Sequence, residues 1–273
     1  MVESIFIKAS GSGSDDAVGL ARAVVGGLPT LQITRPAFAD LMVADCKKAQ
    51  LSRDKAMPKL VFSSNGQGVA LAGQDPKFRD VMLKATWIHA DGQSVVFASR
   101  LTKAPLPERI ATTDFFHDAA EAAVQHNLSF FVLGGSESQN ERAVEQMLTL
   151  YPGLKVVGRR NGYFRPDEED AICADIRASG ADVLWVGLGK PLQEHWCVRN
   201  AAKLKGVGWI KTCGGLYGFL SGDSPRAPNW MQDLCLEWLF RTLQDPKRLV
   251  WRYLTTNPYS LYRLLRYTKS EPV

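Results

Sequence analysis

The second half of the chain alternates between short apolar runs and stretches whose apolar residues recur at helical spacing. An apolar run over 128–133 is followed by Gly134-Gly135 and by a predicted helix over 141–150. The same unit then repeats, with strands predicted at 154–157, 183–186 and 207–211, and helices at 167–178 and 191–204. Strands that alternate with helices of this length pair in parallel through right-handed crossovers. This pattern predicts an α/β fold.

The first half shows the same alternation in a less regular form. Residues 60–63 form a predicted strand followed by a helix through Val81 and Leu83, and residues 87–90 form a second short strand. Together these patterns predict a Rossmann-like parallel sheet core flanked by helices. Open parallel sheets bind ligands at the carboxyl ends of their strands. The residues at such ends that are expected to face one crevice are Asn65, Asp91, Gly134 and Gly187.

The alternation stops after Gly222. The segment Arg226-Ala-Pro-Asn-Trp230 interrupts it, and a helical stretch rich in arginine and aromatic residues follows, with Pro246 and Pro258 within it. From residue 226 to the end there are eight basic and four acidic residues, so this segment accounts for four of the five net positive charges. We therefore predict an α/β core over 1–222 and a basic helical appendage over 223–273.

The composition is that of an ordinary folded protein, with 45% hydrophobic and 22% charged residues. No run reaches the roughly 20 apolar residues that a membrane-spanning helix needs, and the first nine residues lack the basic and apolar parts of a secretory signal. The protein is therefore expected in the cytosol. Its five cysteines are widely spaced, without a C-x-x-C pair, and are expected to be reduced thiols, mostly in the core.

Asp91 lies at a predicted strand end, in the sequence His89-Ala90-Asp91-Gly92. A carboxylate in a partly dry crevice suits a general base that takes a proton from an attacking hydroxyl. The same residue could instead cap the next helix, and the pattern does not choose between the two roles. The four histidines are scattered, and the chain has no Asp-x-Asp pair to chelate a divalent ion. Chemistry without a metal ion is therefore expected.

Two glycine turns follow predicted strands. At Gly134-Gly135, backbone N–H groups before a helix could cradle a phosphate, or the turn could simply require positive φ. The second turn, over 187–194, combines two glycines, a lysine, an amide and a carboxylate. It matches neither a Walker A loop nor a dinucleotide fingerprint, and it could also be an ordinary helix start.

The basic tail mixes arginines with tryptophans and tyrosines. Such a composition suits an interface with anionic lipid. It would also suit binding to nucleic acid or a pair of packed helices, and these alternatives stay open at this point.

Several motifs occur in the order and spacing of one known family. They are Gly187-x-Gly-Lys-Pro-x-Gln-Glu-x-Trp196, Gly214-Gly215 with Gly222, Arg226-Ala-Pro-x-Trp230, Glu237-Trp238-x-x-Arg241, Pro246-x-Arg248 and Arg252-Tyr253. On these motifs the chain resembles the WecG/TagA/CpsF glycosyltransferases over about residues 57 to 256.

The resemblance implies an inverting, metal-independent enzyme without a cofactor. Such enzymes transfer a sugar from a UDP-sugar donor to a polyprenyl-diphosphate-linked sugar during synthesis of bacterial exopolysaccharide, capsule or teichoic acid. The donors are UDP-N-acetylmannosamine, its uronic acid, UDP-glucose or UDP-glucuronate. The enzyme would be cytoplasmic and peripheral on the inner face of the cell membrane, with the appendage as the membrane-associating part. The oligomeric state stays open, a homo-oligomer included.

The resemblance also implies roles for individual residues. The family's base falls on Asp91, its substrate-binding arginine on Arg109 and its glutamine on Gln193, while its Thr-x-Asn segment falls on Ser63 and Asn65. The glycines expected to line the substrate site are Gly134, Gly135, Gly187 and Gly189. The tail arginines expected to dock the membrane and approach the lipid diphosphate are Arg241, Arg248 and Arg252.

The chain departs from the family pattern at three places. Ser63 replaces threonine but keeps the hydroxyl, whereas Ser94 and the segment 111–114 lack glycines that are often present and could reshape the sugar pocket. Two other classes of protein fit the sequence less well. A nucleotide-dependent oxidoreductase lacks support because Leu192 stands at the third glycine position. A basic-tailed nucleic-acid-binding protein lacks support because the sequence contains no recognised nucleic-acid-binding motif.

Overall fold

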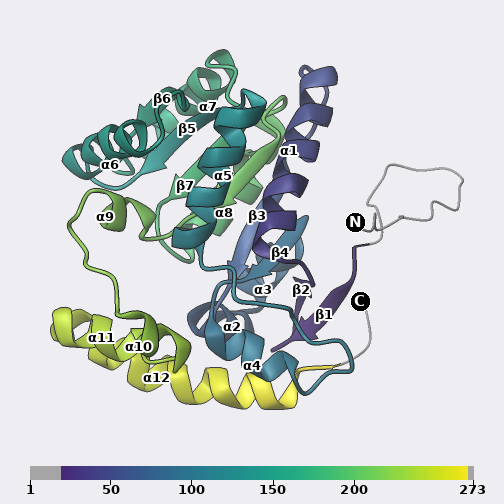
Figure 1. Cartoon of the computed structure of the whole chain (residues 1–273), viewed down its shortest axis with the longest axis vertical. Helices are drawn as coiled ribbons and strands as arrows, with labels where there is room; N and C mark the ends of the chain where they lie inside the picture. The colour runs from purple at the N-terminus through teal and green to yellow at the C-terminus, as the bar shows by residue number, and fades with distance from the viewer. Residues whose placement is uncertain (1–19, 270–273) are drawn as a thin grey trace, which may run out of the picture.

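A six-stranded parallel sheet forms the centre of the molecule (Figure 1). The computed structural model describes residues 20–269, except for the side chains of Asn229, Arg248 and Arg252. In spatial order the strands are β4 (Trp87–Ala90), β3 (Lys59–Ser64), β8 (Trp209–Thr212), β7 (Val183–Gly187), β5 (Ser129–Gly134) and β6 (Lys155–Arg160). All but β6 are almost wholly buried, because helices cover both faces of the sheet. The predicted α/β class and parallel sheet are confirmed.

Two apolar clusters hold the helices against the sheet. The cluster around Trp185 and Trp209 includes residues of α1 (Arg35–Leu51), α5 (Thr112–His126) and α6 (Glu137–Leu150). The second cluster includes residues of α2 (Gly66–Gln74), α3 (Pro76–Leu83), α4 (Gln93–Ser99), α7 (Glu169–Ala178) and α8 (Leu192–Asn200). Short 3-10 turns, η1 (Pro166–Glu168) and η2 (Ala201–Lys203), precede α7 and follow α8.

The prediction of a single helix after β3 is wrong, because the helix is interrupted at Asp75-Pro76. Proline cannot continue a helix but fits its first turn, so α3 starts afresh at Pro76. The Asp75 carboxylate accepts a hydrogen bond of 2.9 Å from the Lys77 backbone N–H and caps this new helix. Apolar periodicity continues across the break, which is why the pattern merges the two helices.

Residues 22–51, for which no element was predicted, form a hairpin and α1. The hairpin pairs β1 (Arg22–Val25) with β2 (Leu28–Leu31) in antiparallel fashion. Gly26 and Gly27 form its two-residue turn with φ values of 61° and 89°, which favour glycine. A bridge between Val24 and Lys269 joins this hairpin to the far end of the described chain.

The helices after Gly222 lie together at one end of the molecule (Figure 1). After α9 (Leu216–Leu220), these helices are α10 (Asn229–Asp233), α11 (Glu237–Gln244) and α12 (Pro246–Arg266). α12 packs on α2, where a Cβ added to Gly73 would lie 2.7 Å from the Tyr259 ring. Leu264 of α12 belongs to the second apolar cluster. We call residues 223–269 the appendage, and the domain division at 222 stays a prediction.

Candidate active site

The ends of β3 and β4 meet at the carboxyl edge of the sheet. The Asp91 backbone N–H donates to the Ser64 carbonyl over 2.8 Å, and a Cβ added to Gly92 would lie 3.0 Å from the Asn65 Cα. Asn65 is the N-cap of α2, and its side-chain oxygen accepts from the Gly68 N–H over 3.0 Å. Ser63 is buried one residue before the end of β3. The structure therefore brings three of the predicted site residues together.

The Asp91 carboxylate lies at the N-terminus of α5. Its Oδ1 accepts a hydrogen bond of 3.1 Å from the Thr112 backbone N–H. Asp91 thus caps a helix, although α5 starts 21 residues later, while the helix directly after Asp91, α4, has Gly92 as its N-cap. The side chain is half-buried. The capping contact occupies one carboxylate oxygen and is compatible with proton transfer at the other.

Arg109 connects this strand end to the appendage. Its Nε donates to the Asp91 carbonyl over 2.7 Å, and its Nη2 lies 2.7 Å from a Glu237 carboxylate oxygen. Its Nη1 lies 3.4 Å from the Gln232 side-chain oxygen. Burial lowers the pKa of Arg109, but the carboxylates of Asp91 and Glu237 outweigh it, so the pKa rises above its ordinary value. Arg109 is therefore a firmly held cation beside Asp91.

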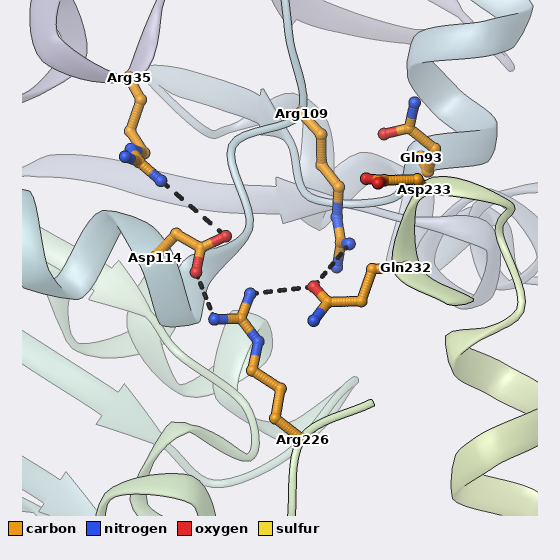
Figure 2. Close-up of a pocket in the computed structure, with 7 residues that line it drawn as sticks. All are labelled: Arg35, Gln93, Arg109, Asp114, Arg226, Gln232 and Asp233. Atoms are coloured by element: carbon orange, nitrogen blue, oxygen red, sulfur yellow. Dashed lines mark hydrogen bonds and ion pairs between the residues drawn. The ribbon is translucent and has the colours of Figure 1, made fainter. Parts of the chain in front are cut away.

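A polar cavity of about 440 Å³ lies between the core and the appendage. Figure 2 shows the side chains that line it, which are Arg35, Gln93, Arg109, Asp114, Arg226, Gln232 and Asp233. Asp114 pairs with both Arg35 and Arg226. Burial raises the pKa of Asp114, but the hydrogen bond and charge of Arg226 hold it below its ordinary value. A cavity of this size with both donors and acceptors suits a small polar ligand.

The 187–194 turn forms a second polar group, which contacts the ends of β3 and β8. Lys190 donates to the Ser63 carbonyl over 2.9 Å and pairs with the buried Glu194 carboxylate at 3.1 Å. Gln193, 1% exposed, donates to Glu194 over 3.0 Å and accepts from the Gly214 N–H over 3.1 Å. Both ends of the Gln193 amide thus bond within the protein.

Gly134 and Gly135 form a tight turn with positive φ, which is the alternative to a phosphate cradle given above. Their φ values are 131° and 69°, and a Cβ added to Gly134 would lie 2.3 Å from the Gly187 carbonyl oxygen. The Gly135 N–H donates to that same oxygen over 3.3 Å. Gly189 has a φ of 79° with open space around it. In the sheet, β8 lies between β7, which ends at Gly187, and β3, which ends just before Asn65.

Lys211 is a charged residue of this region that the sequence analysis missed. It lies in β8, its side chain is fully buried, and its Nζ donates to the Thr212 carbonyl over 2.7 Å. Burial lowers the pKa of Lys211 to about 8, although the negative charge of Asp91 opposes this. The sequence signal for this buried lysine is its position in the predicted strand 207–211, directly after apolar residues.

Of the three tail arginines expected to dock the membrane, Arg241 is the one whose side chain the structure describes. Arg241 lies over the Phe219 ring at 5.1 Å and pairs with Glu237 at 2.7 Å, so it faces the core. The side chains of Arg248 and Arg252 lie outside the described part of the structure. No local pattern assigns a role to the other residues that line the cavity, which are Arg35, Gln93, Asp114, Arg226, Gln232 and Asp233. Arg35 and Arg226 both pair with Asp114, which is distant from each of them in sequence.

Polar side chains at the carboxyl edge of a parallel sheet are typical of α/β proteins that bind their ligand there. The sequence comparisons define the class further. The chain belongs to the glycosyl transferase WecG/TagA/CpsF family, whose model matches residues 25–272. It is therefore a glycosyltransferase, and the resemblance found in the motifs is confirmed.

One curated relative is the N-acetylglucosaminyldiphosphoundecaprenol N-acetyl-beta-D-mannosaminyltransferase of Bacillus spizizenii. The two chains are 30% identical over 199 residues, which cover 73% of this chain and 76% of the relative. No helix within residues 20–269 is both long and apolar enough to cross a membrane.

Proposed function

We propose that this enzyme transfers a sugar from a UDP-sugar to a polyprenyl-diphosphate-linked sugar, with inversion and without a metal ion. The observation that supports this most is that Arg109 lines a polar cavity and donates from Nε to the backbone carbonyl of Asp91. It combines a candidate base with a cation for a diphosphate leaving group. The named activity of the Bacillus relative favours N-acetylmannosamine as the sugar and N-acetylglucosamine as the acceptor sugar.

In the proposed reaction, an acceptor hydroxyl oxygen attacks the anomeric carbon from the face opposite the UDP group. Its proton passes to the Asp91 carboxylate as the new glycosidic bond forms. The bond between the anomeric carbon and the UDP oxygen breaks, and UDP leaves with the electron pair. Arg109 stabilises the charge that develops on the leaving diphosphate. Asn65 and Ser63, at the adjacent strand end, would orient the sugar hydroxyls.

We further propose that the appendage docks on the inner face of the cell membrane, where a lipid-linked acceptor would lie. α12 exposes an apolar stripe at helical spacing, formed by Trp251, Leu254, Leu261 and Leu265, which are 58% to 74% exposed. Apolar surface of this kind on an amphipathic helix suits insertion into a lipid interface. The basic excess of the tail would add attraction to anionic lipid. Arg248 and Arg252 stay proposed contacts of the lipid diphosphate.

The test is a UDP-release assay with a panel of UDP-sugars and a polyprenyl-diphosphate-linked N-acetylglucosamine acceptor. Wild type is compared with Asp91→Asn and with the control Asp80→Asn, which changes a carboxylate that is 68% exposed on α3. We expect release to require both substrates and to fall at least about 100-fold in Asp91→Asn only. Release that is unaffected by Asp91→Asn would remove Asp91 as base, and no release with any donor would contradict the proposed substrates.

A further inference from the structure

Glu237 joins two arginines across the boundary between the core and the appendage. One carboxylate oxygen lies 2.7 Å from Nη2 of Arg109, and the other lies 2.7 Å from Nη2 of Arg241. Arg109 precedes α5 in the core, whereas Glu237 and Arg241 both lie on α11. The Glu237 side chain is 22% exposed and that of Arg109 is 17% exposed, so the contact is largely shielded from water.

Glu237 does not neutralise both of the arginines that it contacts. Two guanidinium groups share one carboxylate, so the three side chains together keep one net positive charge. Burial raises the pKa of Glu237, but the charges of Arg241 and Arg109 outweigh it and hold the pKa below its ordinary value. Glu237 is therefore a carboxylate at neutral pH, and it organises the two arginines without cancelling their combined charge.

The geometry also restrains Arg109. Its guanidinium group is held through Nε by the Asp91 carbonyl and through Nη2 by Glu237, with Gln232 near Nη1. Contacts on different sides of a planar guanidinium fix both its position and its plane. The Arg109 side chain also lines the cavity (Figure 2). Without Glu237, the long arginine side chain would regain several rotamers.

We infer that Glu237 is a positioning residue that orients Arg109 toward the diphosphate of the sugar donor. This inference rests on the proposed function, because it assumes the role of Arg109 given there. Glu237 acts through Arg109 and contacts neither the sugar nor the reacting atoms. Arg241 completes the arrangement by holding the second carboxylate oxygen, so that Glu237 cannot rotate away from Arg109.

The test is a double-mutant cycle on kcat/KM in the full-length chain, with UDP-N-acetylmannosamine and a polyprenyl-diphosphate-linked N-acetylglucosamine acceptor. The variants are Glu237→Ala, Arg109→Gln and the double substitution. We expect Glu237→Ala to lower kcat/KM about tenfold, mainly through kcat, because Arg109 is proposed to stabilise charge that develops as the diphosphate leaves. Because Glu237 acts through Arg109, the same substitution should cause no further loss in the Arg109→Gln background.

A matched control separates positioning from simple docking of the appendage. Asp223→Asn removes another ion pair between the core and the appendage, the 2.6 Å pair with Arg142. This variant should keep wild-type kcat/KM. Glu237→Gln keeps the shape of the side chain and replaces Glu237→Ala if thermal unfolding shows that the alanine variant does not fold.

Three results would overturn parts of the scheme. Transfer by Glu237→Ala at or above the wild-type rate would mean that the carboxylate blocks Arg109 rather than positions it. A full loss that persists in the Arg109→Gln background would mean that Glu237 acts only on structure, and either result refutes the inference while leaving the proposed function intact. No loss in Arg109→Gln itself would instead refute the role of Arg109 in the proposed function.

Discussion

Lys211 shows how one buried side chain can oppose folding. Moving a lysine out of water favours its neutral form, and Asp91 only partly offsets this. The other charged or titratable groups that influence it are Cys213, Lys190 and Glu194. The folded pKa is about 8 against an ordinary 10.5, so the cost at neutral pH is about 3 kcal/mol.

The pH dependence of stability tests this cost. Between about pH 8 and 10.5 the unfolded chain binds the Lys211 proton and the folded protein does not, so the free energy of unfolding should rise with pH in that window. Below about pH 8 the full cost remains. We expect Lys211→Met to remove this rise, measured by urea unfolding from pH 7.5 to 10. Equal slopes in wild type and Lys211→Met would contradict the burial effect.

Asp91 has an observed and a proposed role whose effects can be separated. As a cap of α5 it accepts one backbone hydrogen bond, and loss of this cap in Asp91→Asn should cost about 1 kcal/mol of stability. As the proposed base it should account for a loss of activity of about 100-fold or more. Thermal unfolding and turnover, measured on the same preparation, check both. A large loss of stability would mean that the fall in activity reflects misfolding.

At the scale of elements, α12 has two contrasting faces. Its inner face packs on α2 and includes the buried Leu264, whereas its outer face exposes the apolar stripe. Pro258 lies within the helix, on the exposed side. Burial of one face and exposure of apolar residues on the other is the pattern of an interfacial helix.

Binding to vesicles tests the outer face. We expect the double substitution Trp251→Ser and Leu261→Ser to lower the affinity for vesicles of anionic lipid at least about tenfold, measured by co-sedimentation. Each substitution removes an apolar side chain that would be buried in the lipid interface. The matched control is Leu51→Ser, at the end of α1, where leucine is 87% exposed far from the appendage in sequence. Equal loss in both proteins would contradict a specific role for the stripe. The fold should survive, since the changed residues are exposed.

At the scale of the whole molecule, truncation after Gly222 tests the division into core and appendage. We expect the sheet to fold, with weak membrane binding and little activity. Because α12 packs on α2, removing it exposes apolar surface of the core. The melting temperature of the truncated chain should therefore fall by at least about 5 °C. Circular dichroism and the UDP-release assay provide the measurements. Full activity in the truncated chain would refute any catalytic role of the appendage.

Local patterns in the sequence were enough to predict the α/β class, the order of most strands and helices along the chain, and the polar residues at strand ends. These properties depend on periodicity and on glycine or proline at turns, which are readable over a few residues. Both Asp91 and Asn65 could therefore be predicted to lie at the same edge of the sheet. Asp75-Pro76 is also a local signal for a helix start, but the apolar periodicity continues across it and predicts a single helix.

The tertiary structure alone decided which charged groups meet. Arg109 and Glu237 are 128 residues apart, and Arg226 and Asp114 are 112 residues apart, so no local pattern pairs them. A guanidinium group bonds to whichever carboxylate the fold brings within reach, and that depends on sheet order and on how the appendage packs. The position of Arg241 over the Phe219 ring and the burial of Lys211 have the same origin. Chain periodicity specifies elements, whereas the packing between distant elements specifies the site.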